Sequence, residues 1–259
     1  MSFAGGLGGQ VEVIWALVLR ETRTRFGKNQ LGYLWALFEP LLIIGTFYLL
    51  FRFASRQPGA GMDVYSFIST GFVPYLMFRS TADRIASAIE GNRGLLFYPH
   101  VKPLDLSFAR AVLEAGTYVG VFIVLMGSHA IYHERLVIDD IFLVLQGLAL
   151  AWGLGFTLGL VFCSLGVVSS VMDRTKGTLL RPFFWTSGIF FTANELPGGA
   201  RDVLLYNPVL HAVELVRGGW FPDYTVRYAD PFYVVTWILV LCLGGLVLER
   251  VVRRRIEVT

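Results

Sequence analysis

One carboxylate stands where it could do chemistry within an otherwise apolar segment. Residues 25–51 read RFGKNQLGYLWALFEPLLIIGTFYLLF, in which Glu39 is followed directly by Pro40. An ionised carboxylate costs at least about 3 kcal/mol in hydrocarbon, so we expect Glu39 to face protein or a watery channel. Pro40 removes a backbone donor and can bend a helix, which opens carbonyl groups to a cavity. The sequence therefore predicts either an ion pair of Glu39 with Arg79 or Arg181, or a polar path along this segment.

Motifs for other chemistry are scarce. The nucleotide-binding motif G-x-x-x-x-G-K-[ST] and the hydrolase motifs H-E-x-x-H and G-x-S-x-G do not occur. His129 and His133 are spaced to share one helix face, but a polar ring at the end of a span is equally natural, so we expect no metal site. Apart from Glu39, and Glu114 at the inner end of the apolar segment 115–132, no acidic residue stands well inside an apolar segment, which argues against a proton relay. Any energy source must come from a partner or a gradient.

The elements that position these residues are helices in a membrane. The chain has 259 residues, of which 55% are hydrophobic and only 16% charged, against about 25% charged in soluble domains. Uncharged blocks recur, and about 20 helical residues cross a bilayer core. The N-terminal MSFAGGLGGQ has neither the basic region nor the cleavage site of a signal peptide. We expect an all-α integral membrane protein.

Six spans are predicted, in one transmembrane domain over 1–259. Residues 1–28 would form an N-terminal interface helix and 29–259 a six-span bundle. The second and fifth spans are short, and they reach full length if residues 79–84 and 179–181 are drawn in, with their charges at the boundary. The predicted spans are 29–51, 64–78, 115–132, 141–172, 182–194 and 231–248.

The basic residues predict the orientation of the bundle. With both termini in the cytoplasm, the inner segments hold 16 of the 22 Lys and Arg residues, which agrees with the excess of positive charge on cytoplasmic loops. The other six are Arg52, Arg56, Arg135, Arg201, Arg217 and Arg227.

Two cytoplasmic segments stand out. In residues 11–28, apolar Val11, Ile14, Trp15 and Val18 precede a basic run, which predicts a helix in the inner interface; a simple helix-start anchor is the alternative. Residues 84–110 form a loop of functional length in which a short amphipathic helix, 85–89, is expected to dock on a cytoplasmic partner; a solvated connector is the alternative.

Three further patterns concern packing and the outer side. Residues 194–231 contain two apolar pieces, 203–205 and 209–216, that are too short to cross and predict re-entrant or interfacial helices. The many aromatic residues can stack on sugar rings, although most are expected to serve as interfacial belt or packing residues. Gly155 and Gly159 predict close helix packing within the chain.

Two segments carry a resemblance to a known family. TRFGKNQLGYLWALFEP (24–40) and YNPVLHAVELVRGGW (206–220) are similar to segments of the ABC-2 type permeases that export polysaccharides, above all the capsular-polysaccharide (KpsM-like) branch. The first motif is fairly specific, and the second is common to the broader group. Chain length and predicted topology fit as well, so the resemblance covers essentially the whole chain.

The resemblance implies a non-catalytic permease subunit in the bacterial inner membrane, with both termini cytoplasmic. A homodimer would bind two copies of a separate ABC ATPase, which holds the ATP and Mg, so this chain needs no cofactor. The cargo would be a lipid-linked capsular polysaccharide, passed to a periplasmic adaptor and an outer-membrane channel; no nucleic acid is involved.

The resemblance also implies roles for residues, with the interface helix and the 84–105 loop touching the ATPase and the outer helices acting as a gate. The expected translocation-channel residues are Tyr33, Trp35, Phe38, Glu39, Arg174, Lys176, Arg181 and Trp185. The expected ATPase-coupling residues are Arg20, Arg23, Arg84, Glu90, Arg93, Lys102 and Asp105. The expected outer-gate residues are Tyr206, Asn207, Pro208, Glu214, Arg217 and Trp220.

Alternatives remain open at this point. The cargo of such a permease can instead be O-antigen, teichoic acid or a small drug. From another class, a membrane-embedded transferase acting on lipid-linked sugars would need acidic or histidine residues clustered at one membrane face, and the inner loops supply only scattered ones. A passive scaffold for assembly enzymes would not stimulate a nucleotide-hydrolysing partner.

Overall fold

The computed structural model describes residues 3–26, 31–59, 61–98, 101–132, 134 and 138–256, and every regular element within these ranges is a helix. The elements are α1 (Phe3–Phe26), α2 (Leu31–Phe53), α3 (Val64–Ala86), η1 (Glu90–Leu95), α4 (Pro103–Tyr132), α5 (Ile141–Val168), α6 (Ser170–Leu179), α7 (Arg181–Thr186), η2 (Ala193–Glu195), α8 (Gly198–Leu204), α9 (Pro208–Trp220) and α10 (Pro231–Ile256).

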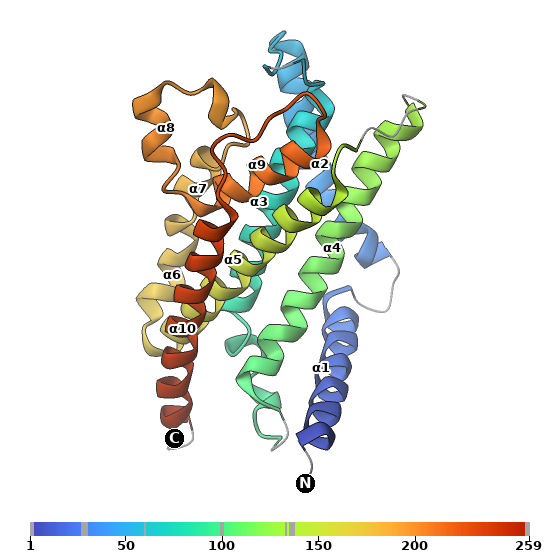
Figure 1. Cartoon of the computed structure of the whole chain (residues 1–259). Coiled ribbons are helices and arrows are strands. Elements are labelled where there is room, and N and C mark those ends of the chain that lie inside the picture. Colours follow the sequence, from blue (N-terminus) through green and yellow to red (C-terminus); the bar gives the residue numbers. More distant parts are fainter. Residues whose placement is uncertain are drawn as a thin grey trace.

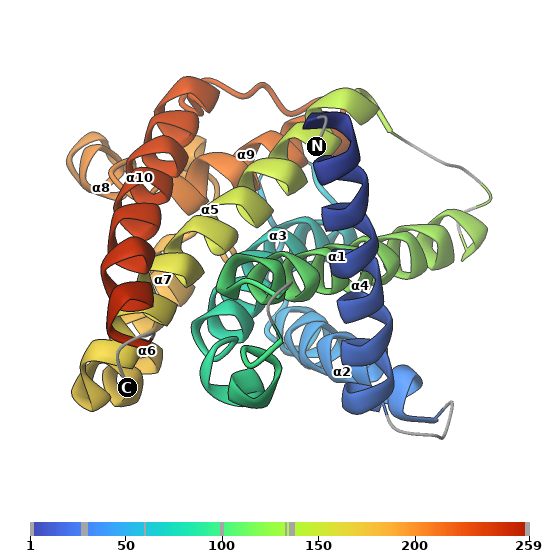
Figure 2. The ribbon, with the colours of Figure 1, turned by 90° about the horizontal axis from the view of Figure 1, so that it is seen from below.

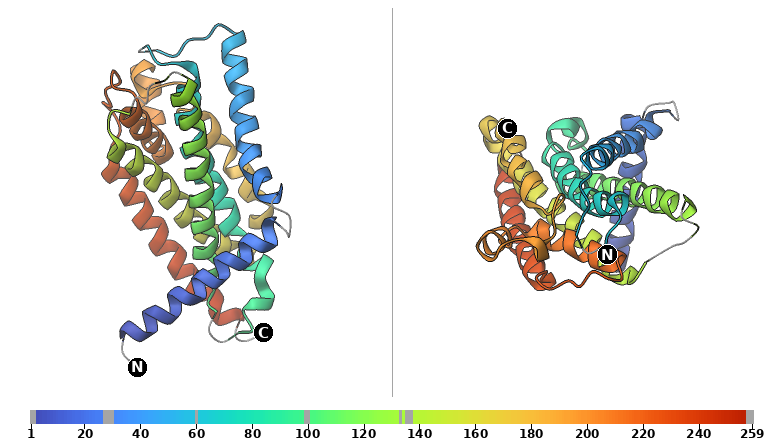
Figure 3. Two further views of the ribbon diagram at one scale, coloured as in Figure 1. Left: turned by 90° about the vertical axis from the view of Figure 1, so that its right-hand side faces the viewer. Right: turned by 90° about the horizontal axis from the view of Figure 1, so that it is seen from above.

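The two ends of the bundle differ in what they carry. Both termini and the loop between α3 and α4 lie at one end, here called the proximal end, whereas α8 and α9 lie toward the opposite, distal end (Figure 1). Seen from below, α1 crosses α4 at the proximal end (Figure 2). A side view shows it inclined to the long axis of the bundle (Figure 3). The role of α1 as an interface helix stays a prediction.

Three helices are long and apolar enough to cross a membrane within the described residues: α4, α5 and Pro231–Val251 of α10. The prediction of an all-helical membrane protein agrees with this finding. The short apolar block 64–78 is part of a longer helix. α3 continues past residue 78 through Arg79 and Arg84 to Ala86.

Some predicted helix boundaries were wrong. The block 141–172 is not one helix, because Ser169 is extended (φ −141°, ψ 114°); it ends α5 and starts α6. In the block 182–194 the α-helix ends at Thr186, and Gly188 then takes a positive φ of 73°, which a helix cannot accommodate; residues 193 and 194 belong to the separate short helix η2. In the 84–110 loop no separate helix covers 85–89, because Ile85 and Ala86 belong to α3 and the short helix η1 begins at Glu90.

Glycines let α5 lie directly against α3. A Cβ atom at Gly155 would meet the carbonyl oxygen of Phe78, and one at Gly159 would lie 2.7 Å from the Cβ of Ile85. The predicted intramolecular role of this glycine pair is confirmed. The main core surrounds α3, where Phe67, Phe72 and Phe78 are almost completely buried.

Candidate functional site

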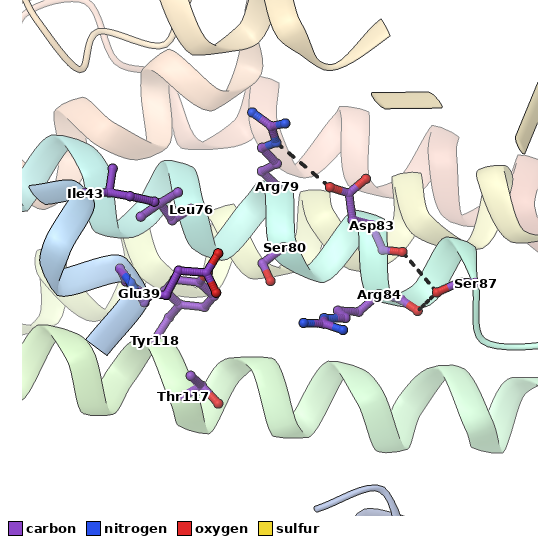
Figure 4. A pocket seen from close by; sticks show the side chains of 11 residues that line it. Glu39, Ile43, Leu76, Arg79, Ser80, Asp83, Arg84, Ser87, Thr117 and Tyr118 are labelled. Atoms are coloured by element: carbon purple, nitrogen blue, oxygen red, sulfur yellow. Dashed lines mark hydrogen bonds and ion pairs between the residues drawn. The ribbon is translucent and has the colours of Figure 1, made fainter. Parts of the chain in front are cut away.

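A charged cavity of about 480 Å³ opens between α2, α3 and α4. One face of α3 supplies more of its wall than any other helix, because residues three and four apart lie on the same side of a helix. α2 contributes Glu39, Pro40 and Ile43, and α4 contributes Thr117 and Tyr118. The residues from α3 are Leu76, Arg79, Ser80, Asp83 and Arg84, and Ser87 follows at its end (Figure 4).

Glu39 reaches from α2 into the space between α3 and α4, beside Ser80 and Tyr118 (Figure 4). α2 continues as one helix through Pro40, whose buried ring forms part of the same wall. Arg79 turns toward Asp83 instead, with 3.9 Å between Nε and Oδ2. Arg181, the other expected partner of Glu39, lies exposed at the start of α7 and does not line the cavity.

Glu114 does not line this cavity, but it is buried against two residues that do. It is 1% exposed, its Oε2 accepts a hydrogen bond of 2.6 Å from Oγ of Ser80, and its Oε1 lies 3.7 Å from Nε of Arg84. The sequence placed Glu114 at the inner end of a span, but its partners lie on another helix. The wall of the cavity thus presents carboxylate, guanidinium and hydroxyl groups, which can form hydrogen bonds with a polar ligand.

A second cavity, of about 510 Å³, lies toward the distal end of α2 and is called here the aromatic pocket. The Phe190 ring lies 5.2 Å from Phe47 and 5.7 Å from Trp185, measured between centroids. Arg56 donates to the carbonyl of Phe190 at 3.2 Å. Trp185 is 66% exposed, so its face is open to a ligand. The lining residues are Phe47, Leu50, Phe51, Ala54, Arg56, Trp185, Phe190 and Phe191.

Both cavities share α2. Phe47 follows Glu39 by eight positions, which corresponds to about 12 Å along a helix. Trp35 and Phe38, also expected on the path, are exposed on α2, with ring centroids 5.8 Å apart. Tyr33 belongs to α2 and Arg174 to α6, but the structure does not describe their side chains. Half-buried Lys176 also lies on α6.

Arg217 holds the backbone of residues 189–191, two of which line the aromatic pocket. Its side chain is fully buried on α9, and it donates to the carbonyls of Phe191 at 2.7 Å and Ile189 at 3.0 Å. Its guanidinium carbon lies 4.1 Å from the centroid of the Phe67 ring. Arg217 therefore positions residues 189–191 and does not itself line the aromatic pocket.

Glu214 completes this buried cluster. Its Oε1 accepts from the backbone N–H of Ala193 at 3.2 Å and lies 3.5 Å from Nη1 of Arg217. The Tyr224 hydroxyl donates to its other oxygen. Tyr224 lies in the loop after α9, and burial raises the pKa of its phenol, so the hydroxyl keeps its proton and remains a donor.

The remaining outer-gate candidates occupy different surroundings. Asn207 caps α9 by accepting from the N–H of Val209 at 3.0 Å, and Pro208 begins that helix. Together with exposed Tyr206 they line an apolar cavity of about 420 Å³ beside α5 and α10. Trp220 is buried, edge-on to Phe122 at 5.9 Å.

Some of the coupling candidates form hydrogen bonds within the chain, and most are exposed. Asp105 is 4% exposed, and it accepts from the backbone N–H of Lys102 at 2.8 Å and from Gln10 at 2.5 Å. Arg20 donates to Asn92 at 2.9 Å. Arg84 lies in the charged cavity. Arg23, Glu90, Arg93 and Lys102 are exposed near the proximal end, and Arg20 and Arg84 are exposed as well.

Comparison with known proteins gives the class of this chain. Residues 12–221 match the ABC-2 type transporters, and the chain belongs to that family. It is 36% identical over 250 residues to the polysialic acid transport protein KpsM of Escherichia coli, with 95% of each chain covered.

Two further relatives extend this similarity. The chain is 32% identical to the capsule polysaccharide export inner-membrane protein CtrC of Neisseria meningitidis serogroup B, over 95% of this chain and 92% of the relative. It is 30% identical to the capsule polysaccharide export inner-membrane protein BexB of Haemophilus influenzae, over 99% of this chain and 97% of the relative.

Proposed function

We propose that this chain is the permease subunit of an ATP-driven exporter that moves lipid-linked capsular polysaccharide out of the cytoplasm. Relatives similar over nearly the full length bear names of capsule polysaccharide export proteins, which supports this cargo over O-antigen and over an enzymatic role. The observation that carries the proposal is that α2 borders both a charged cavity and an aromatic pocket.

The chemistry of the two cavities suits a saccharide. Carboxylate, guanidinium and hydroxyl groups exchange hydrogen bonds with sugar hydroxyls, so Glu39, Ser80 and Arg84 would replace water around an entering chain. In the aromatic pocket, Trp185 and Phe190 would stack on the apolar faces of the sugar rings. Both cavities are open rather than enclosed, as a path for a sliding polymer requires.

The proposed topology has six membrane passages: α2, α3, α4, α5, the α6–α7 pair, and α10. The proximal end would face the cytoplasm, because the predicted inner segments hold most of the basic residues. Both termini would then be cytoplasmic, in the inner membrane of a bacterium.

A complete path would need a second copy of the chain. The exposed side chains of α2, which include Trp35, Phe38 and Leu42, would line or adjoin the interface of a homodimer. ATP with Mg would be bound and hydrolysed by two copies of a separate ATPase. Exposed Arg23, Glu90, Arg93 and Lys102 would contact that ATPase. A periplasmic adaptor and an outer-membrane channel would receive the cargo beyond the gate formed by α8 and α9.

The decisive experiment is co-purification from membranes with the ABC ATPase encoded beside this gene. ATP turnover of the complex would then be measured with and without a lipid-linked capsule precursor, and with a lipid-linked O-antigen precursor as the comparison cargo. A complex of two permease and two ATPase chains that responds to the capsule precursor alone supports the proposal. Failure to bind any ATPase would refute it.

A further inference from the structure

One residue of α4 holds three segments together at the proximal end. Nε of Arg110 donates to Oε1 of Glu21 on α1 at 2.8 Å. Its Nη1 donates to the carbonyl of Arg84, in the last turn of α3, at 2.8 Å and to Oγ of Ser87 at 3.1 Å. The Arg110 and Glu21 side chains are only 14% and 18% exposed. A single guanidinium therefore joins α1, α3 and α4.

The geometry requires the forked shape of arginine. The last carbonyls of a helix lack partners within the helix and carry partial negative charge, so a cation placed there is stabilised. Arg110 satisfies the carbonyl of Arg84 with one nitrogen while another nitrogen binds the carboxylate of Glu21. A lysine, with one compact ammonium group, cannot span both sites in this way.

The surrounding contacts all join α1 to the same region. Leu17 and Val18 of α1 pack in a small apolar cluster that is separate from the main core. Two further hydrogen bonds, Gln10 to Asp105 and Arg20 to Asn92, fall in the same area. The other buried members of the cluster are Ala88, Ile89, Leu106, Ala109 and Cys163.

We propose that Arg110 is the positioning residue that fastens α1 to the loop between α3 and α4, so that both move as one body. A displacement of η1 by a cytoplasmic partner would then carry α1 with it. The inference rests on the proposed function only where that partner is the ATPase, because the fastening itself involves this chain alone.

The test measures the distance between α1 and the loop directly. Spin labels are attached through Val11→Cys on α1 and Phe97→Cys on the loop, positions that are 64% and 89% exposed. The background carries Cys163→Ala and Cys242→Ser. Double electron–electron resonance is recorded for the purified permease and for its complex with the ATPase, with and without ATP. We expect one narrow distance distribution that ATP does not change.

Arg110→Gln should broaden this distribution. Loss of a charge-assisted hydrogen bond should shift the balance between docked and undocked α1 roughly tenfold toward the undocked form. Arg110→Lys should give an intermediate width. The double variant Glu21→Arg with Arg110→Glu restores the ion pair. Its distance distribution should be narrower than that of Glu21→Arg alone. Arg250→Gln, an exposed arginine toward the same end of α10, is the control and should match the parent protein.

Two results would overturn the inference. An α1-to-loop distance that changes with ATP in the parent protein would show that the two parts move independently. A distribution for Arg110→Gln as narrow as that of the parent would show that the residue does not fasten them. Because the measurement works on the permease alone, failure of the ATPase to bind would count against the proposed function and leave this test valid.

Discussion

The carbonyl of Phe191 accepts a hydrogen bond of 2.7 Å from the guanidinium of Arg217, which is completely buried. An arginine on α9 thereby fixes the backbone at the aromatic pocket, although it does not line that pocket. The outer-gate role expected for Arg217 would then be exercised through the segment that it holds.

Arg217→Met should strongly destabilise the protein. It leaves the Ile189 and Phe191 carbonyls without this donor and takes the cation away from buried Glu214, a loss of about 3–5 kcal/mol. The melting temperature in detergent should fall well below that of the exposed control Arg227→Gln. An unchanged melting temperature would show that Arg217 does not hold the segment.

Glu39→Gln should lower polysaccharide export while leaving stability nearly unchanged, because the amide keeps the shape of the side chain but loses its charge within the cavity. Surface capsule and the melting temperature of the purified protein are both measured. Asp202→Asn, an exposed acidic residue on α8, serves as the matched control. Normal export by a stable Glu39→Gln protein would remove Glu39 from the path.

Trp185→Ala should reduce export, and Trp185→Phe should restore part of it, because a ring is needed to stack on sugars. Stability should change little, since the side chain is 66% exposed. The rate of capsule appearance at the cell surface is the measurement. Phe232→Ala, an 81% exposed aromatic on α10, should behave like the parent. An equal rate for Trp185→Ala would argue against stacking at this position.

Gly155→Leu should destabilise the bundle by about 1–3 kcal/mol or more, because the new side chain would push α5 away from the backbone of α3. Thermal unfolding in detergent compares it with Gly244→Leu on α10, where a Cβ atom meets nothing within 4 Å. Similar melting temperatures for the two variants would contradict the close packing described for α3 and α5.

Arg93→Glu should weaken the coupling of ATP hydrolysis to export, because Arg93 is exposed on the loop expected to meet the ATPase. Export per ATP hydrolysed in reconstituted vesicles is the measurement, with Arg227→Gln as the control. The corresponding change at Asp105 is less informative, because burial of an unpaired lysine there would also disrupt the loop. Retained coupling in Arg93→Glu would exclude this arginine from force transmission.

The sequence was a good guide wherever a local pattern carries the information. Apolar blocks predicted α4, α5 and α10, the glycine pair predicted the packing of α5, and the cost of a carboxylate in lipid predicted that Glu39 faces a cavity. The sequence did not predict contacts between residues that lie far apart in the chain. Nothing in the spacing of Glu114 and Ser80, or of Arg110 and Glu21, indicates that they meet, since each partner lies on a different helix. The sequence did not predict the break at Ser169, because the block 141–172 that contains it carries no charged residue.

The buried contacts of Arg217 also bear on the order in which this chain can assemble in the membrane. Phe67, Ile189, Phe191 and Glu214 all precede Arg217 in the chain, so these partners have already been made when the arginine leaves the ribosome. The charge can therefore be sheltered before α10 is synthesised. Membrane assembly of this chain can proceed in sequence order without a stage in which that cation waits unpaired for a later helix.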